Sequence, residues 1–206
     1  MKVVCLSDTH EKHENIHVPE ADLLLHAGDF TLRGEAFAII KFNSWLHSLP
    51  HKNKVVIAGN HDFLFQNNRA VARSLLSAAT YLEDSGTAID GLKIWGTPWQ
   101  PWFHDWAFNL ISEAELKEKF DLIPEGTDIV IAHSPPKGIL DRTGMGVQVG
   151  SSALLEAIYR IKPRLVVFGH VHEAYGITEK DQIIFVNACN CNLAYQPVNR
   201  PIVVEL

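Results

Sequence analysis

Clusters of lysine and arginine are absent from this sequence. Its 206 residues carry 18 basic and 24 acidic side chains, which gives a formal net charge of -6. Proteins that hold a long nucleic acid contact its phosphates through basic stripes or patches. We therefore expect no long nucleic acid as a partner.

Cysteines and long apolar runs are also scarce. The three cysteines are Cys5, Cys189 and Cys191, an odd number without a secretory leader, which is typical of reduced thiols in the cytoplasm. We interpret the C-x-C pair as structural; metal binding is the alternative, although a second matching pair is missing. The first apolar run meets a charged residue at Asp8 and no later run approaches membrane length, so we expect a cytoplasmic protein without a membrane partner.

Internal repeats, low-complexity segments and interdomain linkers are likewise missing. A chain of 206 residues corresponds to one domain of ordinary size. We expect a single domain over residues 1–206.

Short apolar runs that stop at polar residues recur along the chain. They are Lys2–Leu6, Asp22–His26, Lys54–Ala58, Asp128–Ala132 and Arg164–Phe168. Continuous apolar runs of this length indicate strands that are covered on both faces.

Helices and hairpins are predicted between and after these strands. The helical segments are Glu35–His47, with Phe37, Ile40, Phe42 and Trp45 among polar residues; Ser112–Phe120, with a capping box of Ser112 and Glu115; and Ser152–Ile161. The hairpins join Thr87–Ile89 to Leu92–Trp95 through Asp90-Gly91, and Tyr175–Thr178 to Ile183–Val186 through a turn at Glu179–Gln182, before a last strand at Ile202–Val204. This order indicates an α/β fold with a mixed, largely parallel sheet, or two such sheets packed together.

Metal-ligating side chains follow all five apolar runs. They are Asp8, His10, Asp29, Asn60, His61, His133, His170 and His172. In open α/β sheets, ligands bind beyond the carboxyl ends of the strands. Mixed nitrogen and oxygen donors suit Mn, Fe or Zn, and the set is too large for one ion. Two ions that share a carboxylate and a water fit better, an arrangement common in displacement at phosphorus.

Two of these histidines lie in the stretch FGHVHEAYG, residues 168–176. Side chains at i and i+2 of a strand share a side. We nevertheless expect His170 and His172 to leave the strand's path, with Val171 turned to the core. Gly169 would let the backbone approach the site closely.

The motifs together resemble the calcineurin-like metallophosphoesterase superfamily. They are Asp8-x-His10, Gly28-Asp29, Gly59-Asn60-His61-Asp62, His133 and Gly169-His170-x-His172. A narrower resemblance, to the metallophosphoesterase-domain-containing proteins of animals and their bacterial relatives, rests on stretches such as Gly96–Pro101, Pro135–Arg142 and Tyr195–Pro201. The sequence departs from the superfamily pattern at Ala132, where a glycine usually precedes the middle histidine.

The resemblance implies a four-layer αββα fold, in which two mixed, largely parallel sheets form a sandwich flanked by helices. It also implies two divalent transition-metal ions, with Mn as our first choice and Fe or Zn as alternatives. The first ion would be held by Asp8, His10 and His172, the second by Asn60, His133 and His170, and both by Asp29.

The expected reaction is hydrolysis of a phosphate ester by a hydroxide shared between the two ions. His61 would assist the leaving oxygen rather than bind metal. Asp62 would either orient His61 or serve as a surface or capping residue. No covalent phospho-enzyme is expected, because no protein nucleophile is needed.

The substrate is expected to be a small phosphate ester. Only Arg33, Lys137 and Arg142 lie near the motifs, which favours a singly charged diester over a monoester. The narrower resemblance also implies phosphodiesters, including nucleotides and cyclic nucleotides. Trp99, Trp102 and Trp106 either stack a nucleobase or pin a loop to the core, and Asn187 is a weaker candidate contact. A metal-bearing scaffold without catalysis is the remaining alternative.

Overall fold

Two β-sheets packed face to face form the centre of the molecule. A computed structural model describes all residues 1–206. The first sheet has the order β13-β1-β2-β3-β4, formed by β13 (Ile202–Glu205), β1 (Lys2–Leu6), β2 (Leu23–His26), β3 (Asn53–Val56) and β4 (Thr80–Tyr81). Its strands are parallel except for β13, which is antiparallel to β1.

The second sheet has the order β11-β12-β10-β9-β6-β5. Its strands are β11 (Gly176–Lys180), β12 (Ile183–Asn187), β10 (Leu165–Phe168), β9 (Ile129–Ala132), β6 (Leu92–Thr97) and β5 (Ser85–Ile89). The four central strands are parallel, and each edge strand is the antiparallel arm of a hairpin. A separate pair, β7 (Gln100–Pro101) and β8 (Asn109–Leu110), lies in the loop after β6.

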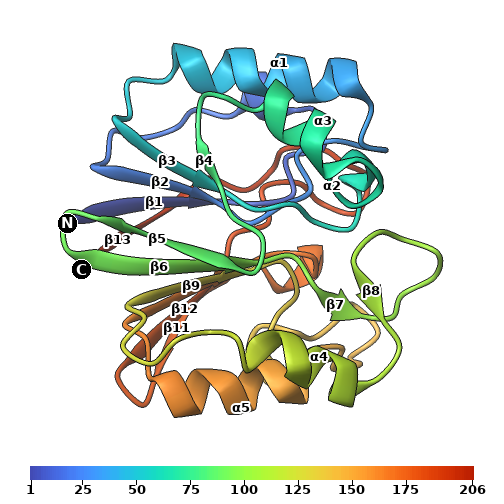
Figure 1. Cartoon of the computed structure of the whole chain (residues 1–206), viewed down its shortest axis with the longest axis vertical. Helices are drawn as coiled ribbons and strands as arrows, with labels where there is room; N and C mark the ends of the chain where they lie inside the picture. Colours follow the sequence, from blue (N-terminus) through green and yellow to red (C-terminus); the bar gives the residue numbers. More distant parts are fainter.

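Helices cover the two outer faces, so the molecule has four layers (Figure 1). The first sheet is covered by α1 (Ala36–Ser48), α2 (Phe63–Asn67) and α3 (Arg69–Leu75), and the second by α4 (Glu113–Phe120) and α5 (Ser152–Ile161). Two single 3-10 turns are η1 (His13–Asn15) and η2 (His172–Ala174). None of the helices combines the length and apolar character that a membrane crossing requires.

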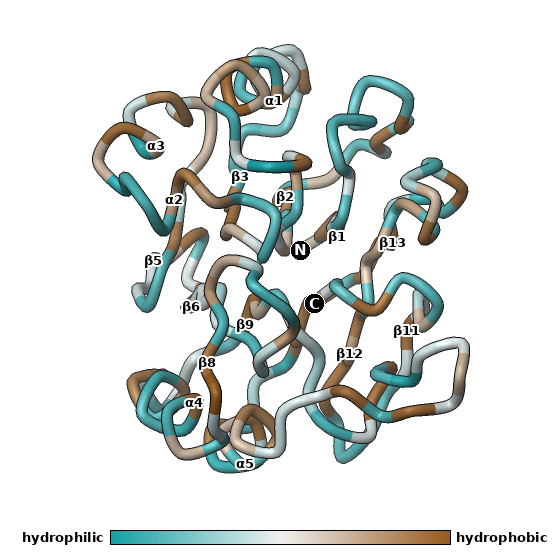
Figure 2. Tube along the Cα trace, turned by 90° about the vertical axis from the view of Figure 1, so that its right-hand side faces the viewer, coloured by the Kyte–Doolittle hydropathy of each residue, from teal (hydrophilic) through white to brown (hydrophobic).

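Successive residues of the central strands point to opposite faces of their sheet, so three apolar layers form: one between the sheets and one beneath the helices on each side. In β1, Val3 and Cys5 pack between the sheets, whereas Val4 and Leu6 pack beneath the helices of the first sheet. Leu165 of β10 likewise packs between the sheets, and its neighbour Val166 packs against α5. Both faces of these strands are buried, which explains their continuous apolar sequence. Hydrophobic residues accordingly follow the strands, and the two termini lie side by side (Figure 2).

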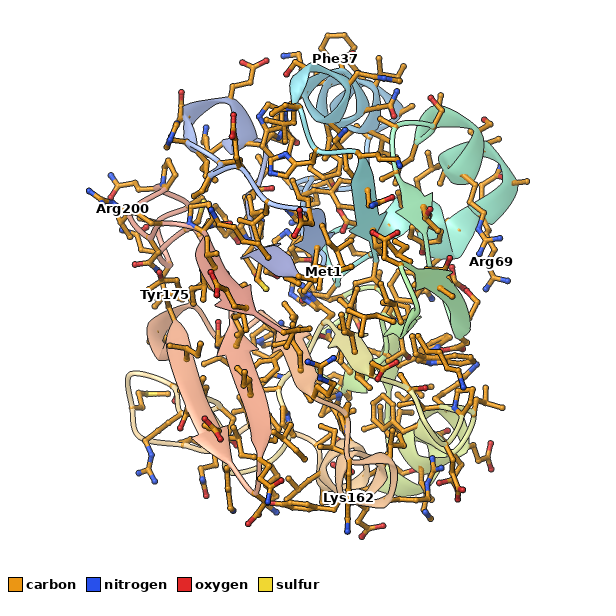
Figure 3. All side chains as sticks on the ribbon, turned by 90° about the vertical axis from the view of Figure 1, so that its left-hand side faces the viewer. Met1, Phe37, Arg69, Lys162, Tyr175 and Arg200 are labelled. Atoms are coloured by element: carbon orange, nitrogen blue, oxygen red, sulfur yellow. The ribbon has the colours of Figure 1, made fainter.

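The predicted fold class is confirmed, including the two packed sheets and their helical cover. The Ser112–Glu115 capping box forms, and α5 has the predicted bounds. In α1, Phe42 and Trp45 are buried, but Phe37 and Ile40 are 66% and 45% exposed. Phe37 projects from the outer surface (Figure 3).

The second hairpin turns more tightly than predicted. Strands β11 and β12 extend to Lys180 and from Ile183, so the turn is only Asp181 and Gln182, with φ of 52° and 65°. Such a two-residue turn with both φ positive matches the twist of the strands.

The sequence pattern missed α2, α3 and the short strands β4, β7 and β8. Asn68 divides what would otherwise be one apolar segment: it ends α2, and its side chain accepts a hydrogen bond from the Val71 N–H to cap α3. Each piece is too short to show a clear helical period.

Candidate metal centre

The loops after five parallel strands bring all the predicted ligands to one edge of the sandwich. Asp8 and His10 follow β1, Asp29 follows β2, Asn60 follows β3, His133 follows β9, and His170 and His172 follow β10. Three groups have ligand atoms within 4.8 Å of one another: Asp8, His10 and His172; His10, Asp29 and His61; and Asp8, Asp29 and His133. Both sheets therefore contribute to one site.

Left-handed backbone conformations direct several of these side chains inward. Asp8, His10, Asp29 and His170 have φ of 51°, 41°, 57° and 67°. Such values are uncommon outside glycine and persist where the surroundings fix them. Here the Asp8 N–H donates to the Gly28 carbonyl at 2.9 Å, and the His10 N–H to the Asp29 carbonyl at 3.0 Å.

The segment after β10 sends its two histidines in different directions. His172 lies with Asp8 and His10, whereas the Nδ1 of His170 lies 2.8 Å from the Asn60 Oδ1. Val171 between them is buried. A Cβ added to Gly169 would lie 2.0 Å from the Asp8 Oδ2, so the backbone does approach the site closely.

The first group turns three ligand atoms toward one another. The Nε2 of His172 lies 3.4 Å from the Asp8 Oδ1 and 3.4 Å from the Nε2 of His10. The Asp8 Oδ1 is buried and accepts no hydrogen bond. The far nitrogen of His172 is held by the Cys191 carbonyl at 2.9 Å, which leaves the near nitrogen free to bind a metal. This donor set fits a divalent cation.

The ligands predicted for the second ion, Asn60, His133 and His170, form a second group around the Asn60 side chain. The Asn60 Oδ1 lies 2.9 Å from the His133 Nε2 and 2.8 Å from the His170 Nδ1. The far nitrogen of His133 donates to the Ala27 carbonyl at 2.9 Å. The Asp29 Oδ2 lies 3.5 Å from the His133 Nε2 and 4.0 Å from the His10 Nε2, so this carboxylate faces both groups.

Each group contains one histidine whose pKa is raised by a carboxylate. Burial alone would lower the pKa of His172, but the Asp8 carboxylate outweighs it and raises that pKa to about 9. Burial is likewise outweighed at His133, whose pKa Asp29 raises to about 9. Burial dominates at His10, whose pKa falls to about 4. Carboxylates that hold protons on neighbouring imidazoles in this way can exchange those protons for a bound cation.

His61 lies beside the two groups and is held on three sides. Its Nδ1 donates to the Leu32 carbonyl at 2.8 Å, and its backbone N–H donates to the Asp29 Oδ1 at 2.8 Å. The Trp106 ring packs against the imidazole with centroids 4.1 Å apart. The remaining Nε2 is 3.9 Å from the Asp29 Oδ2 and faces the cavity.

The Asp62 carboxylate does not contact the His61 ring; the Leu32 carbonyl takes that place. Instead Asp62 is fully buried and accepts hydrogen bonds from the Asp29 N–H at 2.8 Å, the Gly59 N–H at 2.9 Å and the Thr31 hydroxyl at 2.7 Å. Burial, reinforced by the Asp29 carboxylate, raises the pKa of Asp62 to about 7. Asp62 therefore fixes the loops that carry Asp29 and Asn60.

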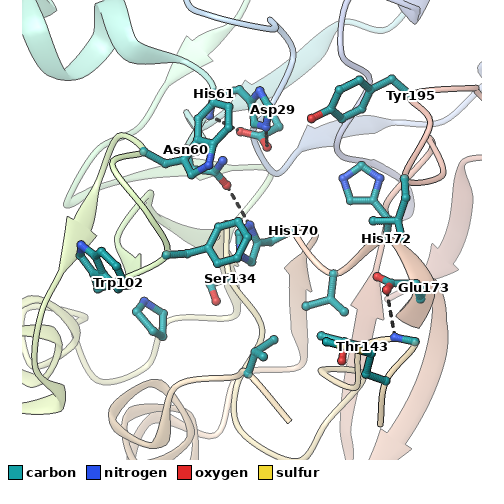
Figure 4. Close-up of a pocket in the computed structure, with 18 residues that line it drawn as sticks. Asp29, Asn60, His61, Trp102, Ser134, Thr143, His170, His172, Glu173 and Tyr195 are labelled. Atoms are coloured by element: carbon teal, nitrogen blue, oxygen red, sulfur yellow. Dashed lines mark hydrogen bonds and ion pairs between the residues drawn. The ribbon is translucent and has the colours of Figure 1, made fainter. Parts of the chain in front are cut away.

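A cavity of about 630 Å³ opens over these groups (Figure 4). Its other walls include Trp102, Phe103 and Trp106, but no lysine or arginine. Trp99 lies outside the cavity: its Nε1 donates to the Asp84 Oδ2 at 2.8 Å, and the ring packs on Phe108. Of the three candidate tryptophans, two line the cavity and Trp99 pins the loop.

Asn187 and the C-x-C cysteines, also considered from the sequence, lie next to the site and hydrogen-bond its loops and ligands. Asn187 is fully buried outside the cavity, and its Nδ2 donates to the Val171 carbonyl at 2.9 Å. The C-x-C cysteines are buried free thiols, and neither belongs to a group of candidate ligands. Cys189 donates to the Asp8 Oδ2 with an S···O distance of 3.2 Å.

Tyr195 also belongs to the site, although the sequence did not predict it. Its ring lies 4.4 Å from the His10 ring, between centroids, and it lines the cavity. Tyr195 stands in a loop after the last predicted ligand, without a strand end to mark it, and only its place in a family-like stretch could have drawn attention to it.

Comparison with known proteins agrees with this geometry. Residues 1–174 match the calcineurin-like phosphoesterase family. The human metallophosphoesterase domain-containing protein 1 is 44% identical over 230 residues, which cover 100% of this chain and 71% of that protein. A UPF0046 protein of Caenorhabditis elegans is 38% identical over 98% of this chain and 74% of its own length.

Solved structures share the fold at low sequence identity. A protein of Thermus thermophilus superposes with a TM-score of 0.61 at 15% identity, over 90% of this chain and 88% of its own. Another structure reaches a TM-score of 0.70 at 17% identity, over 90% and 89% of the two chains. The chain therefore belongs to the calcineurin-like phosphoesterases, a family of hydrolases that act on small phosphate esters at a dinuclear metal centre.

Proposed function

We propose that this protein is a phosphodiesterase whose cavity accepts a small diester such as a nucleotide or cyclic nucleotide. We infer that residues 1–206 form one domain. We also infer that the protein is cytoplasmic, because its three cysteines are free thiols. The proposed ligands are Asp8, His10 and His172 for one ion, Asn60, His133 and His170 for the other, and Asp29 for both.

Mn is the metal we propose, with Fe or Zn as alternatives, because imidazole, carboxylate and amide donors are mixed in the site. Two such ions would lower the pKa of a bound water and neutralise charge on phosphate oxygens. His61 supplies a different function. With Nδ1 committed to Leu32, its Nε2 is the atom that can donate a proton or hydrogen bond to the leaving oxygen.

The observation that favours a diester is the charge of the cavity wall. A monoester carries nearly two charges and is commonly met by arginine or lysine, yet none lines this cavity. Arg33 lies with its Cζ 4.7 Å from the Trp106 ring centroid, and Lys137 and Arg142 are exposed outside the cavity. The exposed ring of Trp102 offers a stacking surface for a base or another planar group.

A substrate panel tests this proposal. Metal-reconstituted protein is offered bis(p-nitrophenyl) phosphate, p-nitrophenyl phosphate, and 3′,5′- and 2′,3′-cyclic nucleotides, with and without added Mn and with a chelator. We expect Mn-dependent hydrolysis of the diesters that the chelator abolishes. Hydrolysis of the monoester alone would indicate a phosphatase, and a metal-loaded protein inactive on every ester would indicate a scaffold.

Two substitutions separate metal binding from leaving-group assistance. Asp29→Ala should lose both ions, because its carboxylate faces both groups. His61→Gln should retain about two ions per chain and lose about 10²- to 10⁴-fold in kcat, the usual contribution of a positioned acid. Metal content is measured by elemental analysis beside the rates; an unchanged rate in metal-loaded His61→Gln would exclude the proposed acid.

A further inference from the structure

Tyr195 occupies the tip of a loop that is fixed by its own hydrogen bonds. Cys191 and Pro197 pair across the base of the loop. The Asn192 side chain accepts from the N–H groups of Ala194 and Gln196, both at 3.0 Å, and the Tyr195 N–H donates to the Asn192 carbonyl at 2.9 Å. Tyr195 itself has φ of 55°, a left-handed conformation that these bonds hold in place.

The ring of Tyr195 covers the edge of the metal centre. Its centroid lies 4.4 Å from that of His10, 5.8 Å from that of His61 and 6.1 Å from that of His172. Figure 4 shows the phenol oxygen pointing across the cavity toward Asp29 and His61. The side chain is half-buried, so the hydroxyl has a fixed direction and still faces the cavity.

The Tyr195 hydroxyl differs from those of the other three tyrosines. The Tyr81 hydroxyl donates to Glu83 at 2.9 Å, and that of Tyr175 donates to the Arg200 carbonyl at 2.8 Å. Tyr159 lies outside the cavity, and the Lys180 Nζ lies 5.8 Å from the centroid of its ring. The Tyr195 hydroxyl makes no hydrogen bond within the protein and points into the cavity.

Besides that of Tyr195, two hydroxyls line the cavity, those of Ser134 and Thr143. No lysine or arginine lines it. His61 has one free nitrogen, since Nδ1 is bonded to Leu32, and the Asn60 oxygen faces two imidazoles. A tyrosine hydroxyl is an uncharged donor at neutral pH.

We propose that Tyr195 is a further catalytic residue, whose hydroxyl donates a hydrogen bond to a non-bridging oxygen of the bound phosphate ester. This role rests on the proposed phosphoesterase activity of the same site. The contact is a neutral donor to an anionic oxygen, which matches a singly charged diester. His61 then serves the leaving oxygen while Tyr195 holds the phosphoryl group.

The test compares Tyr195→Phe with a matched control, Tyr159→Phe, in α5 and outside the cavity. Phenylalanine keeps the ring beside His10 and removes only the hydroxyl. We expect Tyr195→Phe to keep about two Mn per chain and its Tm, and to lose about 10- to 100-fold in kcat/KM for bis(p-nitrophenyl) phosphate, the usual range for a hydrogen bond to a charged group. Tyr159→Phe should retain the wild-type rate.

A second measurement separates this proposal from the activity itself. Inorganic phosphate is titrated into Mn-loaded protein by calorimetry, and its Kd should rise about 10-fold in Tyr195→Phe, as expected when one hydrogen bond to a charged group is lost. Equal phosphate affinity and an equal rate in the wild type and Tyr195→Phe would overturn the role. Loss of Mn from Tyr195→Phe would also overturn it, because the side chain would then act by supporting the metal site. If the wild type binds phosphate but hydrolyses no ester, the proposed function fails while the phosphate contact is still measured.

Discussion

Each proposed ligand in this site depends on neighbours that hydrogen-bond one of its atoms and leave another atom without a partner. Asp29 illustrates this: its Oδ1 accepts from the His61 N–H, and its backbone N–H donates to Asp62, so Oδ2 is the oxygen left for the site. Asp8 is arranged in the same way. Its Oδ2 accepts from the His170 N–H at 3.0 Å and from Cys189, while Oδ1 accepts nothing.

Cys189 should therefore influence metal affinity without touching metal. In Cys189→Ala, the Asp8 carboxylate loses one of the two donors that fix its orientation, and we expect the affinity of the first Mn to fall about 10- to 100-fold, as for other supporting residues. Titration calorimetry with Mn measures this. Cys189→Ser restores a donor and should recover much of the affinity, whereas Cys5→Ala, a thiol buried between the sheets, should lower Tm and leave Mn affinity unchanged.

Neighbouring residues in the sequence proved a poor guide to such supporting contacts. Asp62 follows His61 directly, yet its carboxylate reaches Asp29, Gly59 and Thr31. The partners of His61 are Leu32 and Trp106, which lie 29 and 45 positions away. Contacts of this kind depend on how the loops fold over one another, and no local pattern encodes them.

Strands and the turns that end them set the positions of the ligands. The sequence predicted these elements well because buried parallel strands have a local signal: the apolar runs of β1, β9 and β10 stop at Ser, His and Gly. The α2 and α3 pair lacked such a signal, since each helix is under eight residues and Asn68 divides them. The loop around Tyr195 also lacked one, because its shape comes from the hydrogen bonds of Asn192.

The turn after β10 has no room for a side chain at Gly169. A Cβ there would lie 2.0 Å from the Asp8 Oδ2 and 2.1 Å from the Ser7 Oγ. We expect Gly169→Ala to push apart the ends of β1 and β10, to lower stability by about 1–3 kcal/mol as overpacked sites do, and to weaken the first metal. Thermal unfolding and Mn titration measure the two effects.

Gly86→Ala is the matched control for that substitution. Gly86 lies in the edge strand β5, where an added Cβ would come no closer than 3.1 Å to the Ile94 carbonyl. Mn affinity should stay at the wild-type value and Tm should change little. If Gly169→Ala also kept the wild-type Mn affinity and Tm, the ends of β1 and β10 would have to move apart at little cost, and the proposed effect of the added Cβ would be wrong.

The whole molecule joins two sheet-and-helix halves at one site. The first sheet supplies Asp8, His10, Asp29 and Asn60, and the second supplies His133, His170 and His172. An apolar layer between the sheets holds these halves together, and β13 brings the C-terminal segment into the first sheet. A cation bound by both groups would be linked to the stability of the whole sandwich, because it binds the folded protein and not the unfolded chain.

Stability should also depend on pH through a histidine outside the site. His13 packs beneath α1 between Phe42 and Trp45, and burial, with a smaller effect of Lys41, lowers its pKa from 6.5 to about 4. Between those values the unfolded chain binds a proton that the folded protein does not. Stability is therefore complete above pH 6.5 and is lost as the pH falls toward 4.

Replacing His13 should remove that dependence. Between pH 7.5 and 5 this histidine should account for about 2 kcal/mol of lost stability in the wild type. In His13→Gln the group no longer titrates, so denaturant unfolding of Mn-saturated protein should show a correspondingly smaller loss across the same interval. His17→Gln, at an exposed position four residues along, should keep the full wild-type dependence. If the wild type and both variants lost the same free energy of unfolding between pH 7.5 and 5, His13 would have to accept a proton in the folded protein at its ordinary pKa. The acid sensitivity of the fold would then arise in the metal centre.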